Sequence, residues 1–186
     1  EQVTGTVVAR QRGVQFDLHG EHGEGSLSLR GHIPLSLTSP DGIDGFQANV
    51  EVKHLAIDDT LRKALSVSTP ALDAPWQKSR ATGHFDGIVK VWRPSPTDPL
   101  SHDLQLELDG VSIELPCNGW RAENLTGRLL AQGSGDQARI DFDALRGVLL
   151  HDGGKPAQLA MLGSFGNSPA LHDDLAIVVR GLELDA

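Results

Sequence analysis

The chain has few of the residues that stabilise several common protein classes. A single cysteine among 186 residues excludes an intrachain disulfide and a zinc site built from cysteines alone. Tyrosine is absent, and aromatic residues make up only 4% of the chain. No segment approaches the ~20 consecutive apolar residues of a membrane helix, and no basic-then-apolar start marks a secretion signal. If the chain belongs to an envelope compartment, we therefore expect it to be a processed or excised piece.

Positive charge is also scarce. The chain carries 16 Lys plus Arg against 25 Asp plus Glu, for a net charge of −9. Nucleic acid is therefore not an expected partner, because binding to its phosphates depends on clustered basic side chains. The apolar fraction of 39% with 21 glycines is ordinary for a domain that buries a core.

Short apolar runs separated by glycine and proline predict a protein made mainly of strands. Apolar and polar residues alternate at 46–52 and 104–108, which gives each strand one wet and one apolar face. We expect ten or eleven strands and one or two short helices, at about 58–66 and 72–78. Turns are predicted at 41–42 and 151–154, and the three prolines at 94–99 predict a loop.

Two copies of one unit are visible in the sequence. Thr4-Gly5-Thr6-Val7 returns as Thr126-Gly127-Arg128-Leu129, and Phe16-Asp17-Leu18 corresponds to Ile140-Asp141-Phe142. Further matches keep the same order. The predicted organisation is one repeat-containing segment over 1–186, with copy one at about 4–58, linking helices and strands at 59–125, and copy two at about 126–186.

Three segments share a finer pattern, at 50–58, 106–114 and 177–185. Each has two alternating apolar residues, a charged residue, a Gly or His, two more alternating apolar residues and an acid. In a regular strand the inserted residue would turn the second apolar pair to the opposite face. A β-bulge at Lys53/His54, Asp109/Gly110 and Arg180/Gly181 would keep all four on one face and bend the strand. Gly110 and Gly181 suit a bulge with positive φ, whereas His54 is expected to use another bulge class.

Bulges at equivalent places in three strands predict a strongly curved, mainly antiparallel sheet with an apolar concave face. Such a sheet either closes on itself or on a second sheet, or leaves a groove that holds an apolar ligand. The same apolar residues would serve as the core of a closed β-sandwich that binds a partner protein or glycan. With few aromatic rings, an open groove would be lined by aliphatic side chains, which suit acyl chains better than sugars.

Several short motifs follow one another along the chain: Leu-x-Ile-Asp-Asp-x-Leu-x-x-Ala-Leu at 55–65, Trp76, Gly-His-Phe-Asp-Gly at 83–87, Ile-Glu-Leu-Pro at 113–116, and Leu-Glu-Leu-Asp at 182–185. In this order they resemble the bacterial AsmA/TamB-like envelope proteins. The resemblance implies a taco-shaped β-groove within a bridge that conducts phospholipid between two membranes. It also implies a periplasmic or cell-envelope location, and neighbouring repeats of a longer parent chain as partners. Membrane contact would then be made only by other parts of that parent.

The prediction for function is a non-enzymatic module that shelters phospholipid acyl chains in an apolar β-groove. No nucleophile elbow, phosphate loop or dinucleotide fingerprint occurs, and neither a cofactor nor a metal is expected. The predicted groove is lined by the apolar residues of the three patterned segments: Val50, Val52, Leu55, Ile57, Leu104, Leu106, Leu108, Val111, Ile113, Ile177, Val179, Leu182 and Leu184.

Three histidine-containing segments are candidates for chemistry. Residues 19–24, His-Gly-Glu-His-Gly-Glu, hold two imidazoles and two carboxylates but lie where a hairpin turn is expected, so a solvated turn is the preferred interpretation. His151-Asp152 and His172-Asp173-Asp174 flank predicted turns and are interpreted as exposed polar edges. Among the tryptophans, Trp76 is expected to hold its helix against the sheet, and Trp92 is the most open to an interface role.

Overall fold

The structure is a computed structural model that describes residues 2–35, 45–68, 73–115, 119–134, 137–166 and 174–182. It contains one antiparallel sheet of ten strands in sequence order, which confirms the predicted all-β class. The predictions at 41–42 and at His172-Asp173 lie outside the described residues. The strands are β1 (Gln2–Arg10), β2 (Gly13–His22), β3 (Gly25–Pro34), β4 (Phe46–Ala56), β5 (Thr82–Arg93), β6 (Ser101–Glu114), β7 (Trp120–Ser134), β8 (Gln137–His151), β9 (Ala157–Gly166) and β10 (Asp174–Arg180).

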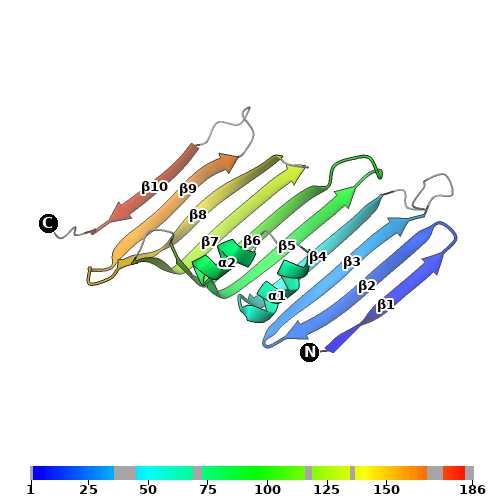
Figure 1. Cartoon of the computed structure of the whole chain (residues 1–186), viewed down its shortest axis with the longest axis horizontal. Coiled ribbons are helices and arrows are strands. Elements are labelled where there is room, and N and C mark those ends of the chain that lie inside the picture. The colour runs from blue at the N-terminus through cyan, green and yellow to red at the C-terminus, as the bar shows by residue number, and fades with distance from the viewer. Residues whose placement is uncertain are drawn as a thin grey trace.

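The sheet is a meander, because each strand pairs with the next one along the chain (Figure 1). Strands β1 and β10 stand at its two edges, and the sheet does not close. Since all ten strands belong to one sheet, the alternative of a closed β-sandwich is wrong for the described part of the chain. The turns from β1 to β2, from β2 to β3 and from β8 to β9 are short, since antiparallel neighbours need only a few connecting residues.

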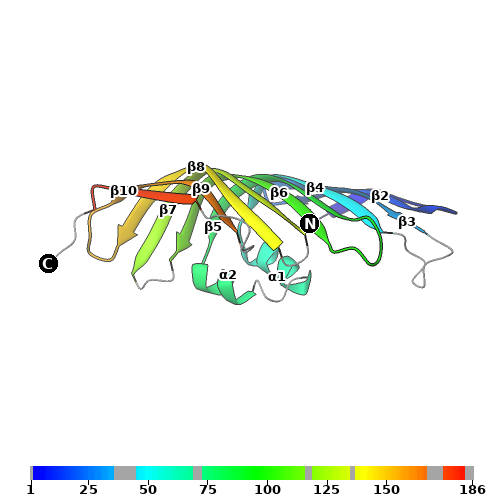
Figure 2. The same cartoon turned by 90° about the horizontal axis from the view of Figure 1, so that it is seen from above.

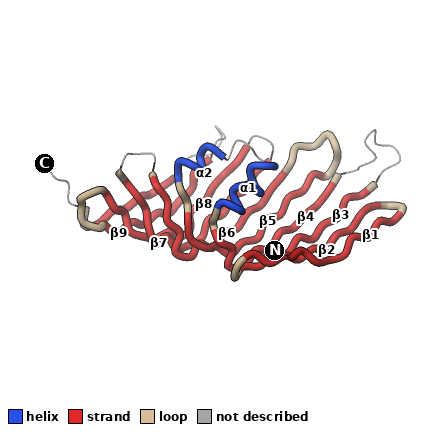
Figure 3. The backbone as a smooth tube through the Cα atoms, turned by 60° about the horizontal axis from the view of Figure 1, so that its bottom comes forward, coloured by secondary structure: helices blue, strands red, loops and turns tan. Residues whose placement is uncertain are grey.

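Two short helices interrupt the meander between β4 and β5. They are α1 (Asp59–Ser68) and α2 (Asp73–Ser79), close to the positions predicted. Asp58 caps α1, because its Oδ1 accepts a hydrogen bond of 2.9 Å from the backbone N–H of Leu61. Seen from above, the sheet is arched and the helices lie on its concave side (Figure 2). They cover only the middle of the sheet and leave strands on both sides uncovered (Figure 3).

The proline-rich segment forms the predicted loop. Strand β5 ends at Arg93, and residues 94–100 connect it to β6 without regular structure. Residues 152–154 likewise form a turn between β8 and β9, as predicted.

The two predicted copies cover β1–β4 and most of β7–β10. Strand pairing shows that the match of Phe16 to Ile140 in the sequence is wrong by two residues. Val7 lies opposite Phe16, and Phe16 opposite Gly31. In the second copy, Leu129 lies opposite Phe142, and Phe142 opposite Gly163. Phe142, and not Ile140, is therefore the structural counterpart of Phe16.

Candidate functional site

The predicted groove residues come together on one face of the sheet. Directly paired residues of antiparallel strands project to the same side, so the ladder identifies the members of each face. Val50 lies opposite Val89, which lies opposite Leu104, and Leu55 likewise connects through Phe85 to Leu108. We call this side the inner face and the opposite side the outer face. Pairing places on the inner face Val50, Val52, Leu55, Leu104, Leu106, Leu108, Val111, Ile113, Ile177 and Val179.

The other three predicted residues stand outside the ladders. Ile57 follows β4 and packs against the buried apolar cluster. Leu182 follows β10 and is 37% exposed, and Leu184 lies outside the described residues. The third predicted bulge, at Arg180/Gly181, stays a prediction. Gly181 has φ of 80°, but the described ladder of β10 with β9 ends at Arg180, and residues 183–186 lie outside the described part of the chain.

The other two predicted bulges are confirmed. The register of β4 on β5 shifts between Val52 and Leu55, and that of β6 on β7 shifts between Leu108 and Val111. Gly110 has φ of 62°, as expected. His54 has φ of 47°, so the expectation that it avoids positive φ is wrong. Its ring stacks on that of His84 with centroids 4.2 Å apart, and its backbone N–H donates to Asp86 Oδ1 at 2.5 Å. These contacts offset the left-handed conformation.

Two further bulges were missed by sequence reasoning. Asn124 in β7 has φ of 53°, and Ala144 in β8 has φ of 54°. The ladders shift at both places, between Glu123 and Thr126 and between Phe142 and Leu145. Neither position carries a glycine, so the signal used elsewhere was absent. Asparagine tolerates positive φ, whereas alanine gives no local sign of it.

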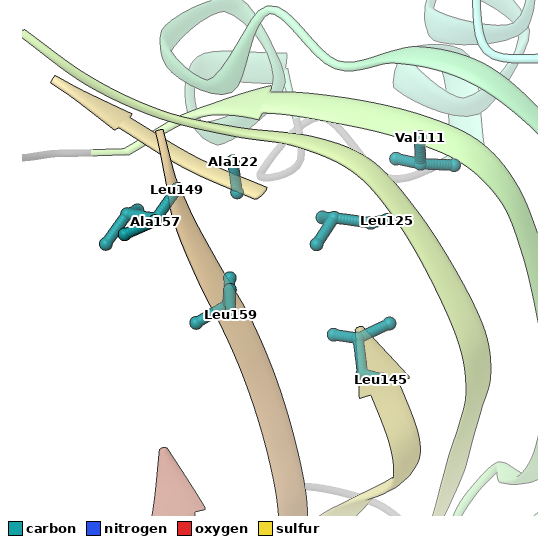
Figure 4. Packing of buried hydrophobic residues seen from close by; sticks show 7 residues of the cluster. All are labelled: Val111, Ala122, Leu125, Leu145, Leu149, Ala157 and Leu159. Carbon is teal, nitrogen blue, oxygen red and sulfur yellow. The ribbon is translucent and has the colours of Figure 1, made fainter. Parts of the chain in front are cut away.

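Burial along the inner face is uneven. A cluster of buried apolar side chains lies in the C-terminal half of the sheet, on β6–β9 (Figure 4). This buried cluster consists of Val111, Ala122, Leu125, Leu145, Leu149, Ala157 and Leu159. Towards the N-terminal edge the face is open, because Val3 and Val7 are 72% and 61% exposed. The side chains of Val50, Leu104 and Leu106 are partly exposed.

The predicted set therefore divides into two parts. Val52, Leu55 and Val111 are buried at 4–5% exposure and serve as core. Val50, Leu104 and Leu106 retain accessible surface on the inner face. Sequence reasoning did not include the partners that complete the face on neighbouring strands. Alternating apolar residues on each strand indicated such partners, but only the strand pairing shows that they continue the inner face. These partners are Leu29, Val89, Leu129, Ile140 and Phe142.

The histidines of the 19–24 segment have separate partners. His19 Nε2 lies 3.1 Å from Asp17 Oδ1, and His22 Nε2 lies 2.7 Å from Asp58 Oδ2. Asp58 accepts from the Leu61 backbone N–H and from His22, and these hydrogen bonds lower the pKa of its carboxyl group. Within the described part of the chain, no three His, Cys, Asp or Glu side chains are arranged to hold a metal ion.

The remaining candidates are spread over the molecule. His151 and Asp152 are exposed at the β8–β9 turn, and the His151 ring lies 4.7 Å from that of Trp120. Trp120 packs against the buried cluster. Trp92 is 37% exposed on the outer face, opposite Gln47 and Ser101 in the ladders. Trp76 is partly buried in α2. These described residues therefore do not come together as one catalytic or binding site.

No family model, no curated protein and no solved structure matches the chain. Neither described helix has the length and hydropathy needed to span a membrane.

Proposed function

We propose that the inner face binds the acyl chains of phospholipid, and that this protein acts without catalysis as a lipid-sheltering module of the bacterial cell envelope. The observation that carries the proposal is the part of the inner face that α1 and α2 leave uncovered. Apolar side chains of successive strands share that face, and no second sheet covers it within the described residues. An aliphatic chain placed there would remove both its own surface and that of the strands from water.

The energetics favour a ligand that is long, apolar and weakly directional. Burial stabilises by about 25 cal/mol per Å² of apolar surface, or ~0.8 kcal/mol for each methylene. Residues such as Val50, Leu104 and Leu106 offer no polar group that would hold an acyl chain at one position. Movement of the chain along the face would then exchange one apolar contact for another. Headgroups would remain in water at the rim, so transfer along a bridge needs no catalytic residue.

Organic extraction followed by mass spectrometry tests the proposal. The purified full chain is expected to carry phospholipid, and Leu106→Asp is expected to reduce the recovered amount at least fivefold. Glu107→Lys, a change at the adjacent exposed position on the outer face, is the matched control and is expected to retain it. A far-ultraviolet circular dichroism spectrum verifies that both variants keep their strands. Equal lipid in Leu106→Asp and the parent chain would refute the proposal.

A further inference from the structure

The outer face carries a hollow that is separate from the proposed lipid-binding surface of the inner face. It spans β7–β10 and has a volume of about 710 Å³. Thr126, Arg146, Ala160 and Val178 form one cross-strand row. Val148, Gln158 and Arg180 form the adjacent row. Since paired residues project to the same side, all seven face the hollow, on the opposite side of the sheet from Leu159 and Val179.

Its two arginines differ from four other arginines of the outer face. Arg30, Arg121, Arg128 and Arg139 each have a carboxylate within 3.8 Å. Among the described residues, neither Arg146 nor Arg180 has a hydrogen bond or an ion pair with an acid. The acid closest in the ladder, Glu123 opposite Val148, pairs with Arg121 at 3.8 Å. Two uncompensated guanidinium groups therefore border one hollow in a chain of net charge −9.

The centre of the hollow is apolar. The small side chain of Ala160 lies between Arg146 and Val178 in its row, and Val148 adjoins Gln158 in the next. Val178 is 45% exposed. Arg146 and Arg180 stand on strands two apart, about 10 Å in the pairing direction. Their long side chains can approach one anion from both sides, and Gln158 supplies a further polar group between them.

We infer that this hollow binds a small organic phosphate or carboxylate that carries a short apolar group. The guanidinium groups of Arg146 and Arg180 hold the anion, because their planar donors match the oxygens of phosphate and carboxylate. The apolar group lies on Val148, Ala160 and Val178. The site is on the opposite side of the sheet from the proposed lipid face and does not depend on it.

Titration of the isotope-labelled full chain with hexyl phosphate, followed by amide chemical shifts, tests the inference. Hexyl phosphate is expected to shift the amides of Val148, Gln158, Ala160 and Val178, and to bind at least tenfold more tightly than inorganic phosphate. The double variant Arg146→Gln/Arg180→Gln is expected to weaken binding at least tenfold. Arg128→Gln, which removes a paired arginine from the same face, is the control and is expected to change it less than twofold.

Three outcomes would overturn the inference. Equal affinity for hexyl phosphate and inorganic phosphate would remove the role of the apolar centre. Unchanged binding in the double variant, or shifts confined to the inner face, would place the ligand elsewhere. Binding to phosphatidylglycerol vesicles without binding of dissolved hexyl phosphate would assign the two arginines to a membrane surface instead. Shifts on the inner face alone would not count against the proposed lipid function, so the two proposals fail independently.

Discussion

The backbone N–H of His54 donates a hydrogen bond of 2.5 Å to Asp86 Oδ1 on the neighbouring strand. This contact lies at the β4 bulge, where the His54 φ of 47° turns Leu55 back to the inner face. A carboxylate therefore satisfies a backbone donor that the shifted ladder leaves without a regular partner. The bulge in β4 is held by a side chain, whereas the bulge in β6 relies on the conformational freedom of Gly110.

Asp86→Ala is expected to destabilise the fold by about 1 kcal/mol, the usual net value of one hydrogen bond. The loss arises because the His54 amide no longer has its charged acceptor. Chemical denaturation monitored by circular dichroism measures it. Asp109→Ala, which removes an exposed acid from the neighbouring strand, is the control and is expected to change the free energy of unfolding by less than ~0.5 kcal/mol. Equal effects of the two substitutions would contradict the bracing role of Asp86.

Asp58→Ala is expected to cost about 1 kcal/mol, because the α1 N-cap and the hydrogen bond to His22 are both lost. The pH dependence follows from the lowered pKa of this carboxyl group. A group with a depressed folded-state pKa contributes its stability above its unfolded pKa, near 3.8, and loses it as the pH falls through the lower folded value. The stability difference between parent and Asp58→Asn is therefore expected to shrink below about pH 4, because the charge of the Asp58 carboxylate is lost there. A difference that grows as the pH falls through this range would contradict the stabilising role of that charge.

Gly31→Ala is expected to destabilise the chain by about 1–3 kcal/mol through steric overlap. A Cβ at Gly31 would lie 2.2 Å from Cζ of Phe16 and 2.6 Å from the carbonyl oxygen of Gln47. The Phe16 ring would have to leave the inner face. Gly154→Ala is the matched control, since the nearest atom to its Cβ is 3.5 Å away and it has no positive φ. Thermal denaturation compares the two, and a stable Gly31→Ala variant would show that the Phe16 ring does not cover this glycine.

Ala144→Gly is expected to stabilise the chain, by up to about 1 kcal/mol. Alanine at φ of 54° pays for a left-handed conformation that glycine adopts freely, and this gain exceeds the entropy glycine loses on folding. Ala160→Gly, in a regular part of β9, is expected to destabilise instead. The two substitutions are expected to change the free energy of unfolding in opposite directions. A loss of stability in Ala144→Gly would argue against a bulge there.

Leu125→Ala is expected to cost about 2–5 kcal/mol, because Leu125 is 3% exposed within the buried cluster. Ile177→Ala is expected to cost below ~1 kcal/mol, since that side chain is 56% exposed at the edge strand. Urea denaturation of both variants measures the contrast. Similar costs would show that the inner face at β10 is covered in solution.

Several features of the fold followed from sequence alone. Alternation with period two predicted strands, and the change of parity after Val52 and Leu108 predicted two bulges before any ladder was known. The prolines after Arg93 marked a loop by local chemistry. These predictions succeeded because a regular alternation or a proline acts within a few residues of its own position.

Other features depended on contacts between strands. Residues Asn124 and Ala144 carry bulges that no glycine marks, and the counterpart of Phe16 was identified only when Gly163 was seen opposite Phe142. Whether Val111 is core and Val50 accessible depends on how strongly neighbouring strands curve around each, which is not encoded at either position. Sequence by itself determined which side chains share a face within a regular stretch of one strand, because that follows from the period of two along the strand. Tertiary structure alone decided that the sheet stays open and where its inner face is covered, because closure depends on the summed twist and pairing of all ten strands.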